Sequence, residues 1–205
     1  MRIPTWIIAA LCLAVPVAAM AADGDAKAGK AKAEEAGCIG CHGTDGIATA
    51  NGLAIDKHVP NLAGEPDLYI QFQLVFFRKG VRKNDLMSPM AAQLSDDDIR
   101  NLAAFYASLP PNKTPVAPDT APDETKYGEK AVQGLHCNNC HGEHLEGMEN
   151  MGRLAGQRED YLYKALSDFK SGARVGTGPE GMSDVVYSLG DPEMKALAHY
   201  LSRLR

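Results

Sequence analysis

The chain has 205 residues, of which 45% are apolar and 23% are charged. This composition excludes a disordered or collagen-like chain, and the length allows one or two domains. The 26 acidic and 21 basic residues give a net charge of −5, which argues against nucleic acid as a partner. Five cysteines are an odd count that needs an explanation in an exported protein.

The first 21 residues have the pattern of a signal peptide. Arg2 precedes an apolar run over residues 6–15, and Ala19-Met20-Ala21 places small residues at the −3 and −1 positions of a cleavage site. We expect cleavage after Ala21 and export to the periplasm. The alternative is an uncleaved anchor, although the apolar run is short for a membrane span of about 20 residues. Cys12 lies in the removed segment, so the mature chain has four cysteines.

The four remaining cysteines form two Cys-x-x-Cys-His motifs, Cys38-Ile39-Gly40-Cys41-His42 and Cys137-Asn138-Asn139-Cys140-His141. This pattern is the attachment signature of c-type haem. Two thiols on one helical turn can add to the two vinyl groups of the porphyrin, and the next side chain then points at the iron. We expect two covalently bound haem c groups. The thiols that attach them are Cys38, Cys41, Cys137 and Cys140, and the proximal iron ligands are His42 and His141.

Two other chemistries could use the same cysteines. A zinc site would need both Cys-x-x-Cys pairs to meet across about 100 residues of chain. A thiol redox motif usually opens a helix in a βαβ setting, and no strand pattern surrounds either pair. Both alternatives are weaker than haem attachment.

Three helices joined by long loops are predicted in the first half. An alanine-rich helix over about 26–36 runs into the first haem motif. A second helix carries apolar residues at helical spacing from 69 to 77 and ends before Gly80. A third begins at Ser95, where Asp98 completes a capping-box pattern.

The second half predicts the same three helices after a proline-rich connector. Residues 110–122 hold five of the 12 prolines, which indicates an extended and rather stiff segment. The helices that follow are expected over about 124–135, from 161 to 169, and from Asp191, with Pro192 at the first helical position. No convincing strand appears, so the predicted class is all-α.

The two halves are copies of one domain. Tyr69 recurs as Tyr161 and Arg82 as Arg174, both shifted by 92 positions, and the Leu-Ala-Gly of 62–64 recurs in the same register. We therefore divide the chain into a signal peptide over 1–21, a first domain over 22–109, a connector over 110–122 and a second domain over 123–205.

The sixth iron ligand is expected to be a methionine, because a soft thioether favours reduced iron. Met87 and Met182 each precede by seven residues the leucine just before the third helix, in a loop that both copies contain. They are the predicted ligands. Met90 is the rival in the first half, three residues nearer the helix.

Other candidate ligands are less well placed. Met148 and Met151 follow His141 too closely to reach the far side of a haem, and Met194 is expected in the core. His58 or His144 could replace a methionine. The histidines without a repeated counterpart are expected to serve surface or packing roles, namely His58, His136, His144 and His199.

The chain resembles the two-haem cytochromes of the cytochrome c4 family. The resemblance is carried by the duplicated Cys-x-x-Cys-His-Gly, by Pro-Asn-Leu-Ala-Gly at 60–64 and Arg-Leu-Ala-Gly-Gln at 153–157, by the repeated Gly-x-Arg and by Met-x6-Leu. It implies two tandem class I cytochrome c domains packed with a pseudo-twofold relation. It also implies that the Pro60 carbonyl accepts the proton of His42. Gly152 stands at the equivalent place in the second copy, where a less rigid loop is expected.

The expected function is outer-sphere transfer of one electron per haem, with no bound small-molecule substrate and no enzymatic activity. The resemblance implies a periplasmic carrier in the respiratory chain, between a quinol-oxidising complex or dehydrogenase and a terminal oxidase. Any membrane association is expected to be peripheral, through such partners. Two alternatives are a dedicated cytochrome subunit of a periplasmic dehydrogenase and, less well supported, a dihaem peroxidase.

Overall fold

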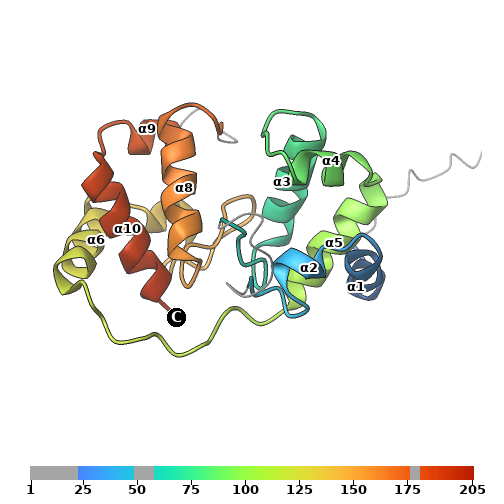
Figure 1. Ribbon diagram of the computed structural model, residues 1–205, viewed down its shortest axis with the longest axis horizontal. Helices are drawn as coiled ribbons and strands as arrows, with labels where there is room; N and C mark the ends of the chain where they lie inside the picture. The colour runs from blue at the N-terminus through green and yellow to red at the C-terminus, as the bar shows by residue number, and fades with distance from the viewer. Residues whose placement is uncertain (1–22, 49–57, 176–180) are drawn as a thin grey trace, which may run out of the picture.

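The computed structural model describes residues 23–48, 58–175 and 181–205, so the predicted signal peptide lies outside the described residues. Over these ranges the chain forms helices, and the one strand-type bridge joins Met148 and Met151. Two helical halves lie side by side, and the connector runs along the lower edge of both (Figure 1). The predicted all-α class is confirmed. None of the described helices is long and apolar enough to cross a bilayer.

Each half contains the same five helices in the same order over the described residues. In the first half they are α1 Ala26–Glu35, α2 Ile39–His42, α3 Asp67–Arg78, α4 Met87–Ala92 and α5 Asp96–Ser108. Their counterparts are α6 Pro122–Gly134, α7 Asn138–His141, α8 Glu159–Lys170, α9 Met182–Val186 and α10 Asp191–Arg203. The three long helices predicted for each half are all present.

Two details of the prediction were wrong. The segments expected as loops around Met87 and Met182 form the short helices α4 and α9, and each methionine is the first helical residue. The first helix also does not run directly into the haem motif, because Gly37 adopts a φ of 74° between α1 and α2. A residue in the left-handed region ends a helix, and glycine adopts this conformation without steric cost.

The start of α5 confirms the capping box. Ser95 Oγ accepts a hydrogen bond from the Asp98 N–H at 3.1 Å, and Asp98 Oδ2 accepts one from the Ser95 N–H at 2.9 Å. In the second half Gly190 caps α10, so Asp191 is the first helical residue and Pro192 the second, one position later than expected for the proline. Proline is tolerated there because the first N–H groups of a helix have no intrahelical acceptor.

Glycine lets the first and last helices of each half cross closely. A Cβ on Gly29 in α1 would lie 1.9 Å from the Asn101 carbonyl oxygen in α5. A Cβ on Gly128 in α6 would lie 2.3 Å from the Ala196 carbonyl oxygen in α10. Both glycines stand nine residues before the first cysteine of a haem motif. The repeat therefore preserves the crossing that holds each motif against its domain.

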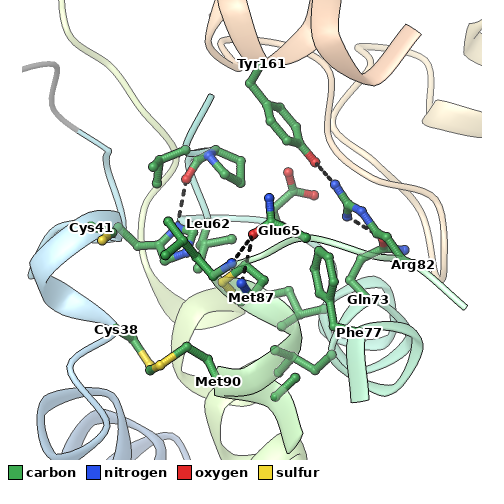
Figure 2. Close-up of a pocket in the computed structure, with 18 of the residues that line it drawn as sticks. Cys38, Cys41, Leu62, Glu65, Gln73, Phe77, Arg82, Met87, Met90 and Tyr161 are labelled. Atoms are coloured by element: carbon green, nitrogen blue, oxygen red, sulfur yellow. Dashed lines mark hydrogen bonds between the residues drawn. The ribbon is translucent and has the colours of Figure 1, made fainter. Parts of the chain in front are cut away.

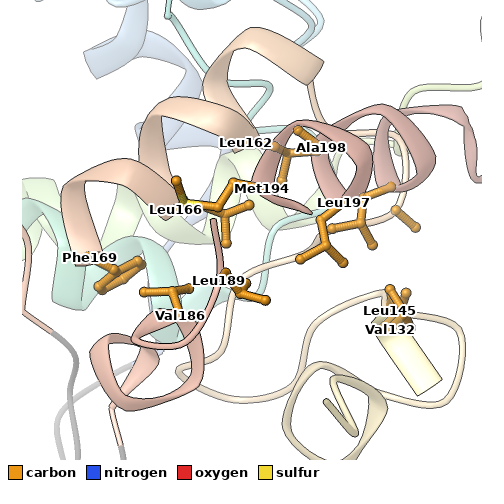
Figure 3. Close-up of a cluster of buried hydrophobic side chains, with 12 residues drawn as sticks. Val132, Leu145, Leu162, Leu166, Phe169, Val186, Leu189, Met194, Leu197 and Ala198 are labelled. Atoms are coloured by element: carbon orange, nitrogen blue, oxygen red, sulfur yellow. The ribbon is translucent and has the colours of Figure 1, made fainter. Parts of the chain in front are cut away.

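The buried core of each half forms one wall of a cavity. In the second half the core joins α6, α8, α9 and α10 (Figure 3), and Met194 is 5% exposed within it, which confirms its predicted core role. The smaller core of the first half joins α1, α3 and α5. Ile70, Leu102 and Tyr106 belong to this core and also line the first cavity. A group inserted in the cavity therefore completes the packing.

The connector is fixed to the second half by the end of α10. Arg203 Nη2 donates to the Ala117 carbonyl at 2.7 Å, and Arg205 Nε donates to the Thr114 carbonyl at 2.9 Å. The His199 ring, 8% exposed, lies between Asp119 of the connector and Glu159 of α8, with both contacts at 3.1 Å. Of the two predicted roles, surface or packing, His199 has the packing role, and its ring contacts two carboxylates.

The His199 contacts predict a stability that depends on pH. Burial lowers the pKa of His199, but the hydrogen bonds to Asp119 and Glu159 outweigh it, so the net shift is upward. This contribution is fully present below the unfolded pKa of about 6.5 and is lost as pH rises through the folded pKa. We expect His199→Gln to raise the equilibrium constant of unfolding about fivefold at acidic pH and by less at alkaline pH. Guanidinium unfolding checks this, with the exposed His144→Gln as control; equal effects of His199→Gln at both pH values would contradict it.

Candidate functional site

The first cavity brings together the residues predicted for the first haem. It contains about 1370 Å³ of space outside protein atoms, including its mouth. Cys38 lines it from the residue before α2, Cys41 and His42 from α2 itself, and Met87 and Met90 from α4. Figure 2 shows the two cysteines on one side of this cavity, with Gln73, Arg82 and Tyr161 on another.

The second cavity repeats this arrangement. It contains about 1400 Å³ outside protein atoms, and it is lined by Cys137, Cys140, His141 and Met182. The near-equal size follows from the duplication of the domain. Each set of residues predicted for a haem is thus gathered around its own cavity.

Both histidines are oriented by a backbone carbonyl. His42 Nδ1 lies 3.0 Å from the Pro60 oxygen, and His141 Nδ1 lies 2.7 Å from the Gly152 oxygen. Burial lowers the pKa of both rings, against the opposing effect of these hydrogen bonds. A neutral ring that donates from Nδ1 leaves the Nε2 lone pair for a metal. The proline contact implied by the resemblance is present, and Gly152 supplies the same contact in the second half.

The structure narrows the choice among the methionines. Met87 and Met90 lie three residues apart on α4, so both reach the first cavity, but Met90 is 36% exposed whereas Met87 is partly buried. In the second cavity Met182 is joined by Met151, which the sequence had disfavoured. Met151 directly precedes Gly152, whose carbonyl holds His141, so it lies on the proximal side. Met148 is 46% exposed.

The other histidines are separated by the fold. His58 lines the first cavity and His136 lines the second, whereas His144 is exposed and lines neither cavity. Of the two histidines predicted as possible replacements for a methionine, His58 lines a cavity and His144 does not.

The cavities fit a large apolar group with covalent anchors. Tyr106 lines the first cavity, and its buried hydroxyl has no hydrogen-bond partner among the described residues. Its counterpart in the second cavity is Leu201, which needs no partner. The two Cys-x-x-Cys pairs line different cavities, so the fold does not bring them together as a shared zinc site would require.

The thiols do not have the character of a redox motif. Burial raises the pKa of Cys38 and of Cys137. Thiol redox chemistry instead needs a lowered pKa at the attacking cysteine. The donor set in each cavity, two thiols with one neutral histidine and a thioether, suits haem c.

Reciprocal arginine contacts join the two halves. Arg82 Nη2 donates to the Tyr161 hydroxyl at 3.3 Å, and Arg174 Nη2 donates to the Tyr69 hydroxyl at 3.0 Å. Both arginines also donate to Gln73 Oε1, at 2.7 and 3.0 Å. Because Arg82 and Arg174 are equivalent positions, as are Tyr69 and Tyr161, this exchange has the symmetry of an approximate twofold axis.

A second group of buried contacts lies beside the arginines. Asn61 and Gln157 exchange two hydrogen bonds: the Asn61 N–H donates to Gln157 Oε1 at 2.8 Å, and Gln157 Nε2 donates to the Asn61 carbonyl at 2.9 Å. Glu65 accepts from the Arg153 N–H at 2.8 Å and from Gln157 Nε2 at 3.2 Å. Glu65, Tyr69, Gln73 and Tyr161 line both cavities, so this interface is the shared wall between the two sites.

The interface explains why Gly152 replaces a proline. A Cβ on Gly152 would lie 2.8 to 3.1 Å from three carbons of the Tyr69 ring.

We expect Gly152→Ala to lower the free energy of unfolding by about 1–3 kcal/mol and to perturb the second haem more than the first, because the Gly152 carbonyl orients His141. Chemical unfolding and haem absorbance check this. Gly134→Ala is the control, because a Cβ there meets nothing within 4 Å; equal effects of the two variants would contradict the interpretation.

Sequence reasoning missed the interface residues as functional. In the sequence Tyr69, Tyr161, Arg82 and Arg174 are markers of the repeat, and nothing marks Glu65. Their identical spacing in both copies was an available signal, because a repeated polar residue outside the haem motif must have a repeated partner. Only the packing of the halves shows that each partner belongs to the other copy.

Comparisons with known proteins agree with this geometry. Residues 24–105 match the family described as cytochrome c oxidase, cbb3-type, subunit III, and residues 125–205 match the family described as cytochrome c. A cytochrome c4 of Thiocapsa roseopersicina is 34% identical over 191 residues, covering 88% of this chain and 93% of that protein. A thiosulfate dehydrogenase electron acceptor of Thiomonas intermedia is 33% identical over 177 residues, covering 82% and 79%. The crystal structure of reduced cytochrome c4 from Pseudomonas stutzeri is similar with a TM-score of 0.75 and 30% identity, covering 89% of this chain and 100% of that one.

Proposed function

The chain belongs to the cytochrome c4 family of dihaem electron-transfer cytochromes, and on this premise we propose that it is a periplasmic carrier between respiratory complexes. It carries two covalently bound haem c groups and is an electron-transfer protein, not an enzyme. In the proposed role it takes electrons from a quinol-oxidising complex or a dehydrogenase and delivers them to a terminal oxidase. Contact with membranes is then peripheral, through these partners.

The proposed haem sites use the residues gathered around the two cavities. The first haem is assigned to residues 22–109 and the second to residues 123–205, joined by the connector 110–122. Cys38, Cys41, Cys137 and Cys140 would attach the haems, and His42 with Met87 and His141 with Met182 would ligate the two irons. The proposed location depends on residues 1–21 acting as an export signal cleaved after Ala21.

Each haem supplies an iron that changes between Fe(III) and Fe(II) as one electron enters or leaves. The protein keeps the surroundings of the iron constant during this change. The carbonyls of Pro60 and Gly152 hold the histidine rings in place, and burial lowers the pKa of both rings, which favours their neutral form. Fixed ligands need little rearrangement, which favours fast outer-sphere transfer.

The shared wall between the cavities is the observation that carries this proposal. Glu65, Tyr69, Gln73 and Tyr161 line both cavities, and hydrogen bonds cross the interface in both directions. Two redox centres held in one unit can store two electrons or relay one between partners. This arrangement suits a carrier that docks briefly with different complexes, because redox partners form small, transient interfaces.

A second candidate role is service to a single dehydrogenase. The similarity to a thiosulfate dehydrogenase electron acceptor over 82% of the chain favours it. In this role the protein is the dedicated cytochrome of a periplasmic dehydrogenase.

Rapid-mixing kinetics on the haem-loaded protein separate the two roles. The oxidised protein is mixed with a quinol-oxidising complex and quinol, and separately with thiosulfate dehydrogenase and thiosulfate. A carrier is reduced quickly by the first system and reoxidised by a terminal oxidase. Fast reduction by the dehydrogenase alone supports the dedicated role. A high-spin haem or rapid turnover of peroxide would contradict both.

A further inference from the structure

Glu65 is the one buried carboxylate among the described residues. Its side chain belongs to the loop before α3 and lies at the interface between the halves, where the residue is 4% exposed. Burying a carboxylate is costly unless its charge is compensated. Packing alone does not explain why a carboxylate occupies this position.

The hydrogen bonds to Glu65 come from neutral groups. The donors are the backbone N–H of Arg153 and the side-chain amide of Gln157. The guanidinium of Arg153 donates through Nε to the Ala155 carbonyl. Neutral donors stabilise a carboxylate less than a direct ion pair does.

Charged and titratable side chains surround Glu65 on each element that packs against it. Arg153 in the loop before α8 and Arg174 after α8 act on it as positive charges. Tyr69 on α3 and Tyr161 on α8 are phenols that interact with it electrostatically, and Arg82 bonds to Tyr161. Despite the two cations, burial raises the pKa of Glu65 to about 7. Small electrostatic changes can thus alter its protonation near neutral pH.

The internal repeat shows that the charge is specific to one copy. Glu65 is equivalent to Gln157, shifted by 92 positions as Tyr69 is to Tyr161. The equivalent place in the second half is thus filled by a neutral amide of nearly the same shape. The two side chains meet across the interface, so the pair contains a single ionisable group.

We propose that Glu65 couples electron transfer to proton binding, taking up one proton from solvent when the protein is reduced and releasing it on oxidation. In each cycle the redox partner supplies the electron that converts Fe(III) to Fe(II), and a solvent proton converts the Glu65 carboxylate to the acid. Glu65 lines both cavities, so an electron in either one acts on it. The inference rests on the haem placement proposed above.

The sign follows from electrostatics. An added electron makes the surroundings more negative, which disfavours the carboxylate and raises the proton affinity of Glu65. Linkage is reciprocal, so protonation of Glu65 raises electron affinity by the same factor. The reduction potentials then fall as pH rises from the pKa of Glu65 in the oxidised protein to its pKa in the reduced protein. They level off below and above this range. A coupling of about tenfold appears as a total fall of about 59 mV for a one-electron couple.

Redox titration of the haem-loaded protein from about pH 5 to about pH 9 tests the proposal. The wild type is compared with Glu65→Gln, which reproduces the amide of the other copy, and with Glu149→Gln. Glu149 is an exposed glutamate whose backbone carbonyl accepts from the Tyr69 N–H at the same interface. We expect both potentials of the wild type and of Glu149→Gln to fall with pH around neutrality. In Glu65→Gln this fall is lost, and the potentials stay near the acidic limit of the wild type.

Infrared difference spectra, reduced minus oxidised, provide a second measurement. Near neutral pH the wild type should gain a band of a protonated buried carboxyl on reduction, and Glu65→Gln should lack it. Wild-type potentials that do not change with pH overturn the proposal even if the variant fails to fold. A pH dependence that persists unchanged in Glu65→Gln also overturns it and assigns the proton to another group, such as a haem carboxylate. Failure of the haem assignment would appear differently, as missing or high-spin haem.

Discussion

Met87→Ala should remove about half of the thioether-to-iron absorption band of the oxidised protein and lower the potential of one haem. A thioether stabilises reduced iron, so its loss favours Fe(III). We expect a decrease on the order of 0.1 V, within the range of about 0.8 V that axial ligands span. Absorbance of the oxidised protein and a redox titration give the two readouts.

Met90→Ala is the matched control for the first haem. Met90 lies on the same short helix, lines the same cavity and is 36% exposed. It should leave the absorption band and both potentials nearly unchanged. If Met90→Ala removes the band while Met87→Ala keeps it, the first axial assignment is wrong.

Met182→Ala should remove the other half of the band. Met151→Ala is its control, because Met151 also lines the second cavity but adjoins the residue that holds His141. The double variant Met87→Ala with Met182→Ala should lack the band entirely. A residual band in the double variant would show that another sulfur ligates iron.

Arg174→Ala should lower the free energy of unfolding by about 2–3 kcal/mol, because it removes a buried charged donor that makes two hydrogen bonds. Arg174 is 6% exposed, donates to Tyr69 and Gln73 across the interface, and stacks on the Phe169 ring at 4.6 Å. Its removal leaves the Tyr69 hydroxyl and the side-chain oxygen Oε1 of Gln73 without this donor. Denaturant unfolding of the haem-loaded protein measures the loss.

Arg82→Ala should cost less than Arg174→Ala, because Arg82 is partly exposed and can exchange its contacts for water. A double-mutant cycle of Arg174→Ala with Tyr69→Phe isolates the cross-interface bond, which we expect to contribute about 1 kcal/mol. Arg174→Lys should not restore full stability, since an ammonium lacks the planar guanidinium that stacks on the Phe169 ring. A zero coupling energy would mean that the bond from Arg174 to Tyr69 adds nothing to stability.

Local sequence patterns predicted the helices well. Ser95 and Asp98 form the capping box, and the periodic segments before Gly80 and Gly172 form α3 and α8. Such signals act within one or two helical turns, so they do not depend on the rest of the chain. The short helices α4 and α9 were missed because their few residues carry no periodic pattern.

The site was predicted in part for the same reason. The two cysteines and the histidine of each motif are neighbours in the chain, so their spacing alone indicates where they lie. The methionine is distant in sequence, and its choice depends on how α4 and α9 are placed. Met151 in the second cavity shows the difficulty, because chain distance from His141 did not keep it away from the cavity.

The sequence by itself determined that this is a duplicated, all-helical, dihaem protein with four attachment cysteines. Motif spacing and internal repetition are properties of the chain and need no coordinates. The tertiary structure alone decided how the copies meet: Arg82 and Arg174 bond to tyrosines of the opposite half, Gly152 makes room for Tyr69, and Glu65 is buried between two cavities. These features depend on contacts between residues about 80 to 105 positions apart. Such contacts form only when both domains have folded and packed together.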